Sequence, residues 1–364
     1  MIVKDEGHII RRCLEAARPL VDFALIVDTG SSDDTILVAS QTMRDLGLDG
    51  LVVAQPWRDF AHNRSLALAT LRERADIDYA LMIYADDRLV LEDGFDAAKA
   101  ALTLDLYNLQ TRLGGCTYLR PQMISNRKPF RFKGVLHEFL ACDEPFDQGE
   151  LPGLHVLSLQ DSARNQRPDK FRRDARTLEQ ALASETDEFL RARYTFYLAQ
   201  SYRDGGQAAQ SIETYLARAE MGFWEEEVFC SLLYAARQIQ TEGQDHEAAI
   251  AAYLRAADVR PGRAEALHGA SRLCRILGDH ARGFEIAARG VGLTPPSDGL
   301  FVEPWIYDFG LLDEYAVHAF WTGRHRDSLD ACLKALARDD LPPADRARIA
   351  ENARFALDGL AGDA

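Results

Sequence analysis

Three short apolar runs near the start of the chain each end in a polar loop. They are FALIVDTG (23–30), LVVAQPW (51–57) and YALMIYADD (79–87). Nearly continuous apolar runs of this length are typical of parallel strands that are covered on both faces. Amphipathic segments flank or separate them, at roughly 6–18, 33–47 and 61–75. This alternation predicts a doubly wound α/β sheet, with any ligand at the carboxyl ends of the strands.

The second half of the chain has a different rhythm, which is helical and rich in alanine. Ala249 and Gly283 occupy matching places 34 residues apart, and so do Pro261 and Pro295. A 34-residue period is the tetratricopeptide spacing, and it predicts three or four helix-turn-helix units that bury small-residue faces against one another. Aromatic residues in this pattern are expected to pack in the core: Tyr202, Tyr215 and Tyr253. We therefore predict two domains, residues 1–165 and 166–364.

Composition restricts the possible partners. The 364 residues include 42 Lys and Arg against 57 Asp and Glu, a net charge of -15, which disfavours nucleic acid or anionic lipid as a partner. No apolar run approaches the roughly 18 residues of a membrane span. The six cysteines form no C-x-x-C pair, and no apolar signal segment follows Met1. These features predict a cytoplasmic protein with thiols buried in its core.

The letters Asp28-Thr29-Gly30-Ser31 match an aspartic-protease loop, but their context does not. Such a protease needs two facing aspartate loops that share a proton, and the chain has no second Asp-Thr-Gly. Here the loop leads from a strand into a helix. A strand that ends in Asp28 and turns through Gly30 instead presents a carboxylate to the ribose or base of a ligand.

Five segments of the chain carry motifs in a fixed order. The first is MIVKDEGHIIRRCLEAARPLVDFALIVDTGSSDDT, at the amino terminus. The others are PWRDFAHNRSLAL (56–68), LMIYADDRLVL (81–91), FKGVLHEFL (132–140) and DSARNQRPDKFRRDARTLEQAL (161–182). Together they resemble family-2 glycosyltransferases of the GT-A fold, and the fourth resembles a subgroup with a Gly-x-x-His-Glu strand. The resemblance covers residues 1–182 and implies a GT-A-type, Rossmann-like α/β domain with a mostly parallel sheet, ahead of the all-α tetratricopeptide-like domain.

The resemblance also implies an activity, which is transfer of a sugar from a nucleotide-sugar donor to an acceptor hydroxyl, with inversion and a divalent metal. A UDP- or GDP-sugar is the expected donor. Asp28 would contact the base or ribose, and Arg64 would pair with the diphosphate, as guanidinium groups do. The alternative for Arg64 is a surface salt bridge, and for Asp5 and Glu6 it is the acidic start of a helix. The residues expected to bind the donor are Val3, Asp5, Glu6, Asp28, Arg64 and Asp86.

The expected metal, Mn²⁺ or Mg²⁺, would be held by Asp86 and His137. The family's Asp-x-Asp motif stands here as Tyr84-Ala85-Asp86, so its first carboxylate is missing and metal binding is weakened unless Asp87 compensates. His137 and Glu138 are neighbours in an expected strand, so they point to opposite faces and are not expected both to reach the metal.

A general base near the acceptor hydroxyl completes the expected site. The candidates are Asp87, Glu138 and Asp161, which the sequence does not rank. A basic cluster either closes over the diphosphate or forms a solvated helix face: Lys170, Arg172 and Arg173.

Two other functions are considered, of which one remains open and one is disfavoured. Because the first motif carboxylate is missing, the first domain can also be a transferase domain that has lost its activity, on a repeat scaffold that binds proteins. A sugar-phosphate nucleotidyltransferase is disfavoured because its glycine-rich loop is absent near the first strand. In the transferase interpretation the repeat domain holds a saccharide or protein acceptor, or mediates association into a homo-oligomer.

Overall fold

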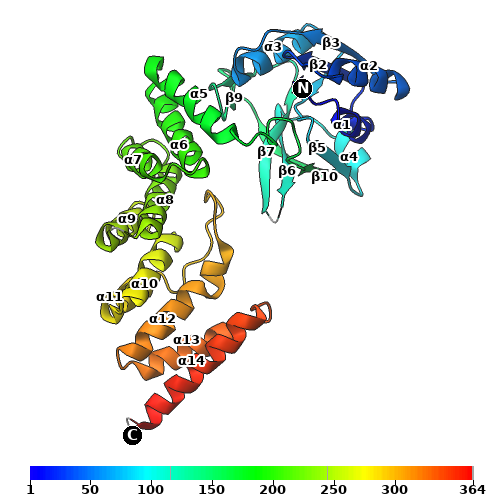
Figure 1. Cartoon of the computed structure of the whole chain (residues 1–364). Helices are drawn as coiled ribbons and strands as arrows, with labels where there is room; N and C mark the ends of the chain where they lie inside the picture. Colours follow the sequence, from blue (N-terminus) through cyan, green and yellow to red (C-terminus); the bar gives the residue numbers. More distant parts are fainter. Residues whose placement is uncertain (115, 244, 363–364) are drawn as a thin grey trace. The chain divides into compact units, whose positions relative to one another are not determined.

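The protein is described by a computed structural model over residues 1–114, 116–243 and 245–362 (Figure 1). The chain divides into two compact units, Met1–Ala183 and Ser184–Ala364. This division falls further along the chain than the predicted boundary, because nearly all of helix α5 (Lys170–Ser184) belongs to the first unit. The extent of functional domains stays a prediction.

The described strands of the first unit form three sheets. The parallel sheet has the order β1 (Ile2–Val3), β2 (Phe23–Asp28) and β3 (Asp49–Ala54). The larger sheet has the order β4 (Tyr79–Leu81), β7 (Cys116–Ser125), β6 (Leu106–Leu113), β10 (Gln148–Ser158) and β5 (Asp87–Leu91). A hairpin of β8 (Arg131–Lys133) and β9 (Phe139–Ala141) forms the third.

The prediction of a mostly parallel sheet is wrong for the described residues. Three strand pairings are parallel, β1 with β2, β2 with β3 and β6 with β10, and four are antiparallel. The physical reason lies after residue 105, where β6 and β7 follow one another directly. Strands joined by a tight turn pair antiparallel, whereas a parallel pair needs a long crossover.

Helices cover the parallel sheet, as the amphipathic segments predict. The helices before α5 are α1 (Ile10–Ala17), α2 (Thr35–Asp45), α3 (Phe60–Arg72) and α4 (Phe95–Ala100). Four residues of α1 at helical spacing are buried. Ile10 and Leu14 pack with residues of β2 and α2, and Cys13 and Ala17 pack with residues of the larger sheet. Helix α3 begins at a good N-cap, because the side chain of Asp59 accepts a hydrogen bond from His62 N at 2.7 Å.

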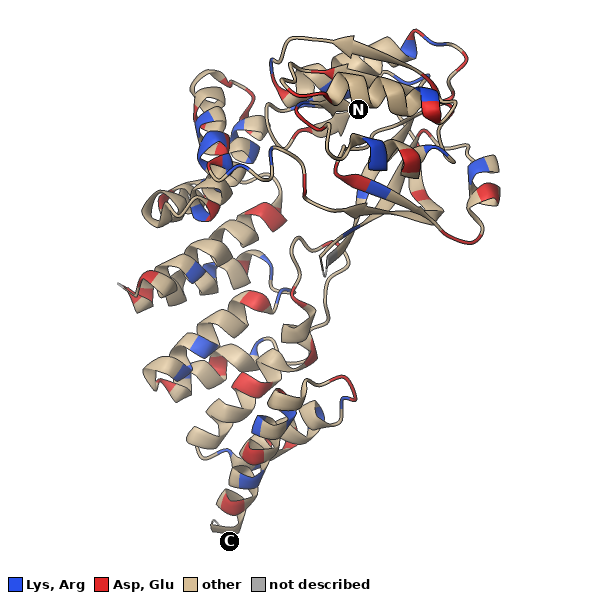
Figure 2. Cartoon of the chain, turned by 45° about the vertical axis from the view of Figure 1, so that its right-hand side comes forward, with Lys and Arg blue, Asp and Glu red and all other residues tan. Residues whose placement is uncertain are grey.

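The second unit consists of four helical hairpins and a final helix within the described residues. The hairpins are α6 (Glu188–Asp204) with α7 (Ala208–Ala219), α8 (Glu225–Glu242) with α9 (His246–Val259), α10 (Glu265–Leu277) with α11 (His280–Ala288), and α12 (Leu311–Trp321) with α13 (His325–Leu336). A short π-helix, η1 (Ile306–Gly310), precedes α12, and α14 (Pro343–Gly362) closes the unit. Acidic and basic residues are interspersed along these helices (Figure 2).

The predicted repeat is confirmed in its helical units and its core. Ala249 lies in α9 and Gly283 in α11, so the matched positions fall in the second helix of successive hairpins. The three tyrosines are buried, as expected for core positions: Tyr202, Tyr215 and Tyr253. The described residues contain no helix with the length and apolar character that a bilayer crossing requires.

The thiols match the expectation of free, mostly buried cysteines where the structure describes them. Four are buried and Cys142 is partly exposed, and all five are free: Cys13, Cys142, Cys230, Cys274 and Cys332. The side chain of Cys116 lies outside the described residues.

Gly283 lies close to the ring of His318 in the second unit, and this packing can be tested. A Cβ on Gly283 would lie 2.1 Å from Cε1 of His318, a fully buried ring whose Nε2 bonds Ser271 O at 3.0 Å. We expect Gly283→Ala to lower the free energy of unfolding by about 1–2 kcal/mol through overpacking. Gly262→Ala is the control, since no atom lies within 4 Å of that Cβ. Equal urea midpoints for the two variants would contradict the packing assigned to Gly283.

Candidate active site

The loops after β1 and β2 are joined by a network of side-chain to backbone hydrogen bonds. Asp5, with φ 58°, accepts from Ser32 N at 2.7 Å through Oδ1, and Asp5 N donates to Ser31 Oγ at 2.9 Å. Glu6 N donates to Thr35 Oγ1 at 2.8 Å. Val3 is buried, and its carbonyl oxygen accepts from Thr29 N at 2.9 Å. The structure thus brings four predicted donor-binding residues together: Val3, Asp5, Glu6 and Asp28.

Asp28 uses its oxygens on its own turn. The carboxylate is 3% exposed and accepts from Gly30 N at 3.0 Å, from Ser31 N at 3.1 Å and from the Ser31 hydroxyl. Gly30 has a φ of 102°, which residues with a side chain rarely adopt. The backbone of this turn therefore favours glycine at position 30. Asp28 therefore shapes the loop at the end of β2.

Glu6 differs electrostatically from the other carboxylates of this group. It is 7% exposed and makes no ion pair with the described residues, while its Oε2 accepts from Ala163 N at 3.3 Å. The pKa of Glu6 is raised to about 7, mainly by burial. The nearby negative charge of Asp86 acts in the same direction. Glu6 thus changes charge close to neutral pH.

Asp86 lies in the turn that follows β4, and β4 is shorter than the apolar run that predicts it. Strand β4 ends at Leu81, and Asp87 N donates to Tyr84 O at 3.0 Å to close the turn before β5. Oδ2 of Asp86 accepts from Asn165 Nδ2 at 3.1 Å. Asn165 Oδ1 in turn accepts from Lys170 Nζ at 2.7 Å. A chain of two hydrogen bonds therefore connects Lys170 with the motif carboxylate.

Arg64 sits in a largely buried cluster and not in a surface salt bridge. Its Nη1 lies 2.6 Å from Oε1 of Glu138, and it donates to the Tyr84 hydroxyl at 2.7 Å. Its guanidinium carbon lies 4.4 Å from the centre of the Tyr84 ring, and that of Arg120 lies 4.7 Å from it. The residue in place of the first motif carboxylate is thus held by two guanidinium groups.

Each of the three candidate bases has an arginine partner. Arg120 bonds Asp87 at 2.7 Å, Arg64 lies 2.6 Å from Glu138, and Arg12 bonds both oxygens of Asp161 at 2.8 Å. The Arg12 hydrogen bonds lower the pKa of Asp161, which weakens it as a base. Burial raises the pKa of Asp87 despite the opposing charge of Arg120.

His137 does not lie on a strand, so the prediction that His137 and Glu138 point to opposite faces of one is wrong. Strand β8 ends at Lys133 and β9 begins at Phe139. Between them the backbone bends through Gly134 at φ 101° and His137 at φ 52°, and the His137 side chain is exposed. Glycine in a left-handed conformation is what ends the strand.

The described side chains do not form a complete ligand set for the implied divalent metal by themselves. Over residues 1–114, 116–243 and 245–362, no three or more His, Cys, Asp or Glu side chains are grouped as metal ligands. The carboxylate of Asp86 is bonded to Asn165, and that of Asp87 is paired with Arg120. Mg²⁺ and Mn²⁺ prefer several oxygen ligands from hard donors, and this set does not offer them.

Comparisons with known proteins give partial similarities. No family model matches the chain. The chain is 30% identical over 149 residues to a TPR repeat-containing protein of Synechococcus elongatus, which is 38% of this chain and 34% of that protein. It is 29% identical over 109 residues to an uncharacterized glycosyltransferase of Rickettsia felis, 29% of this chain and 35% of that protein. The chain thus spans about a third of the length of these curated relatives.

Among solved structures, S. aureus TarS 1–349 in complex with UDP-GlcNAc is 12% identical. The match covers 71% of this chain and 89% of that chain, with a TM-score of 0.35.

Proposed function

We propose that the first unit transfers a sugar from a nucleotide-sugar donor to an acceptor hydroxyl, with inversion. The observation that carries the proposal is the meeting of Asp5, Glu6 and Asp28 at the carboxyl ends of β1 and β2, with the negative charge of Asp86 acting on Glu6. Ligands of open α/β sheets bind at that edge. The similarity to a curated glycosyltransferase and to a TPR repeat-containing protein supports the same pair of parts.

The residues take the following roles in the proposal. Asp5 and Asp28 shape the loops that receive the base and ribose of a UDP- or GDP-sugar. Lys170, connected to Asp86 through Asn165, supplies positive charge to the diphosphate. Mn²⁺ or Mg²⁺ at Asp86 and His137 stays a prediction of the resemblance.

Glu6 is the preferred base, ahead of Asp87, Glu138 and Asp161, because it has no arginine partner among the described residues and its pKa lies near 7. The acceptor oxygen gives its proton to the Glu6 carboxylate and forms a bond to the anomeric carbon of the donor. The bond from that carbon to the diphosphate oxygen breaks, and the diphosphate leaves with the electron pair. The acceptor, a saccharide or protein, its binding to the repeat unit, self-association and a cytoplasmic location stay proposals.

A second candidate is favoured by one observation, the pairing of Arg64 with Glu138 and its hydrogen bond to Tyr84. A guanidinium neutralised in this way is a poor partner for phosphate. In this alternative the domain has lost catalysis and the chain is a protein-binding module.

A thermal-shift screen separates the two candidates. UDP-, GDP-, CMP- and dTDP-sugars are added to the full chain with and without Mn²⁺, and one donor class is expected to raise the melting temperature with its concentration. Asp86→Asn keeps the shape and the acceptor for Asn165 but removes the charge, so we expect it to lose the part of the shift that depends on Mn²⁺. Asp49→Asn, at an exposed position that starts β3, is the control and should keep it. No shift with any donor would instead favour the binding module.

A further inference from the structure

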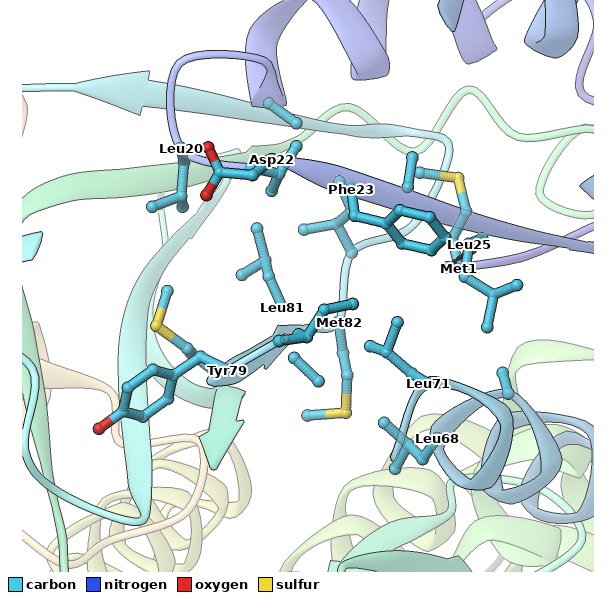
Figure 3. Close-up of a pocket in the computed structure, with 18 of the residues that line it drawn as sticks. Met1, Leu20, Asp22, Phe23, Leu25, Leu68, Leu71, Tyr79, Leu81 and Met82 are labelled. Atoms are coloured by element: carbon cyan, nitrogen blue, oxygen red, sulfur yellow. Dashed lines mark hydrogen bonds between the residues drawn. The ribbon is translucent and has the colours of Figure 1, made fainter. Parts of the chain in front are cut away.

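A polar cavity of about 1040 Å³ lies within the second unit, bordered by the segment that connects α11 with α12. Helices α8, α9, α10, α12 and α14 contribute the rest of its lining. It contrasts with a cavity of the first unit, between β2 and β4, which apolar side chains such as Phe23, Leu71 and Leu81 line (Figure 3). The size of the polar cavity is at the upper end of the range for small-molecule sites.

The segment before α12 is held against the neighbouring helices by buried charged side chains. Arg263 donates to Leu300 O at 3.2 Å. Glu303 N and the Tyr307 hydroxyl donate to the two oxygens of Glu265 at 3.1 and 2.8 Å. The segment therefore lies beside the start of α10 (Figure 1). A buried ion pair adds little net stability over apolar packing, and this cluster instead fixes the position of the segment.

Trp305, at the end of this segment, brings a partly exposed indole ring to the cavity. It is 43% exposed although it lines the cavity. A Cβ on Gly310 would lie 2.5 Å from Cζ3 of the ring, so the ring rests against the π-helix η1. Such π-helical turns are frequent at functional sites. A positioned aromatic ring that is left partly open offers a stacking surface to the apolar face of a ligand.

The ring nitrogens of His268 have no hydrogen-bond partner among the described residues, although this side chain is 9% exposed and lines the cavity. The His268 ring centre lies 5.0 Å from that of Trp305. Burial lowers the pKa of His268 to about 4, and the positive charge of Arg272 acts in the same direction, so the ring is neutral at neutral pH. A neutral imidazole offers one donor and one acceptor, and leaving them buried and unpaired is costly. Hydroxyl groups can pair with either nitrogen.

The charges that line the cavity balance one another, but one arginine lacks an acidic partner. Four arginines and four acidic side chains line it, and three of the arginines pair with those acids: Arg237, Arg275 and Arg348. In the part of the chain that the structure describes, Arg272 makes no ion pair and no side-chain hydrogen bond. It follows His268 by four residues on α10, so both lie on one face of that helix. A balanced lining with unused hydrogen-bonding groups favours an uncharged polar ligand.

We propose that this cavity binds a neutral saccharide, with a sugar ring against Trp305 and sugar hydroxyls bonded to His268 and Arg272. A sugar ring has an apolar face that can lie on an indole, and its hydroxyls both donate and accept. An anion would meet the carboxylates of the lining, and a cation would meet Arg272. In the transfer reaction this saccharide is the acceptor. That assignment rests on the proposed function, whereas binding in the cavity does not.

Saturation-transfer NMR of the full chain, without any nucleotide-sugar, tests the binding. The probes are the methyl glycosides of glucose, galactose, mannose, N-acetylglucosamine and rhamnose. We expect at least one to bind, with its affinity reduced about tenfold or more in Arg272→Met and in Trp305→Ala. Arg272 is exposed, so its variant keeps the fold even if Trp305→Ala does not. The matched controls are Arg326→Met and Trp321→Ala, at exposed positions outside the cavity lining, and both should keep the native affinity.

No binding of any glycoside, or equal binding by the native chain and Arg272→Met, would overturn the inference. Tetra-alanine with a free carboxyl group is a further probe. If it bound more tightly than every glycoside and lost this binding in Arg272→Met, the site would belong to a protein terminus and the saccharide assignment would be wrong. A thermal shift with a donor but no glycoside binding would reject the cavity site alone. Glycoside binding without any donor shift would support the cavity site and count against the transfer reaction.

Discussion

Replacing Arg263 with methionine is expected to lower the free energy of unfolding of the second unit by about 3–5 kcal/mol. Arg263 is fully buried, and it donates to both oxygens of Glu265 at 2.9 Å and also pairs with Glu226. Both carboxylates are fully buried, so the variant leaves Glu265 without its arginine and Glu226 with only its pair to Arg260 at 2.8 Å. Breaking a buried ion pair costs far more than a surface pair contributes.

Urea denaturation of the full chain, followed at the transition of the helical unit, measures this loss. Arg255→Met is the matched control, because Arg255 pairs with Glu220 at 2.6 Å with both side chains exposed, and it should cost less than about 1 kcal/mol. Adding Glu226→Gln and Glu265→Gln to the Arg263 variant should restore part of the stability. Equal losses for the two arginine variants would show that the buried cluster does not hold the hairpins together.

Replacing Glu6 with glutamine is expected to raise the free energy of unfolding at pH 8 by about 2 kcal/mol after solvent screening, with no change near pH 4. The folded state raises the pKa of Glu6 from 4.5 to about 7, so it favours the protonated carboxyl. The contribution of Glu6 to stability is thus complete below pH 4.5 and is lost as the pH rises to about 7. Glutamine does not titrate and still offers an oxygen to Ala163 N.

Denaturation midpoints at pH 4, 6 and 8 for the native chain and the variant give this difference directly. If Glu6 is also the base, the rate of sugar transfer should lose its rise around pH 7 in the variant, while donor binding persists. A stability difference that is the same at all three pH values would contradict the raised pKa. A normal pH–rate profile with the expected stability change would remove Glu6 only from catalysis.

The sequence was sufficient for the order of parts but not for the arrangement of the sheets. Apolar periodicity predicted the strand around Ile26 and the helical hairpins around Ala249, because both signals are local. The antiparallel pairings of β4 with β7 and of β5 with β10 depend on which strands meet in space. Strand β4 was predicted too long because the apolar run continues past Leu81 as far as the turn at Tyr84–Asp87.

The candidate site shows the same division. The acidic residues at the ends of β1 and β2 were found from the family resemblance and their places after apolar runs. Their neighbours were missed, since Arg12, Arg120 and Asn165 reach their carboxylate partners from 149, 33 and 79 residues away in the chain. Asn165 lies in segment 161–182, and its place in that segment of the family resemblance is the one sequence indication of a role. Spacing along the sequence does not reveal such partners.

Hydrogen exchange of the full chain with and without the donor that gives the largest thermal shift tests the central claim most directly. That claim is that the donor binds at the loops after β1 and β2 and at the turn before β5. We predict slower exchange at residues 4–7, 28–35 and 84–87 when the donor is bound. Slowing confined to other segments would contradict it.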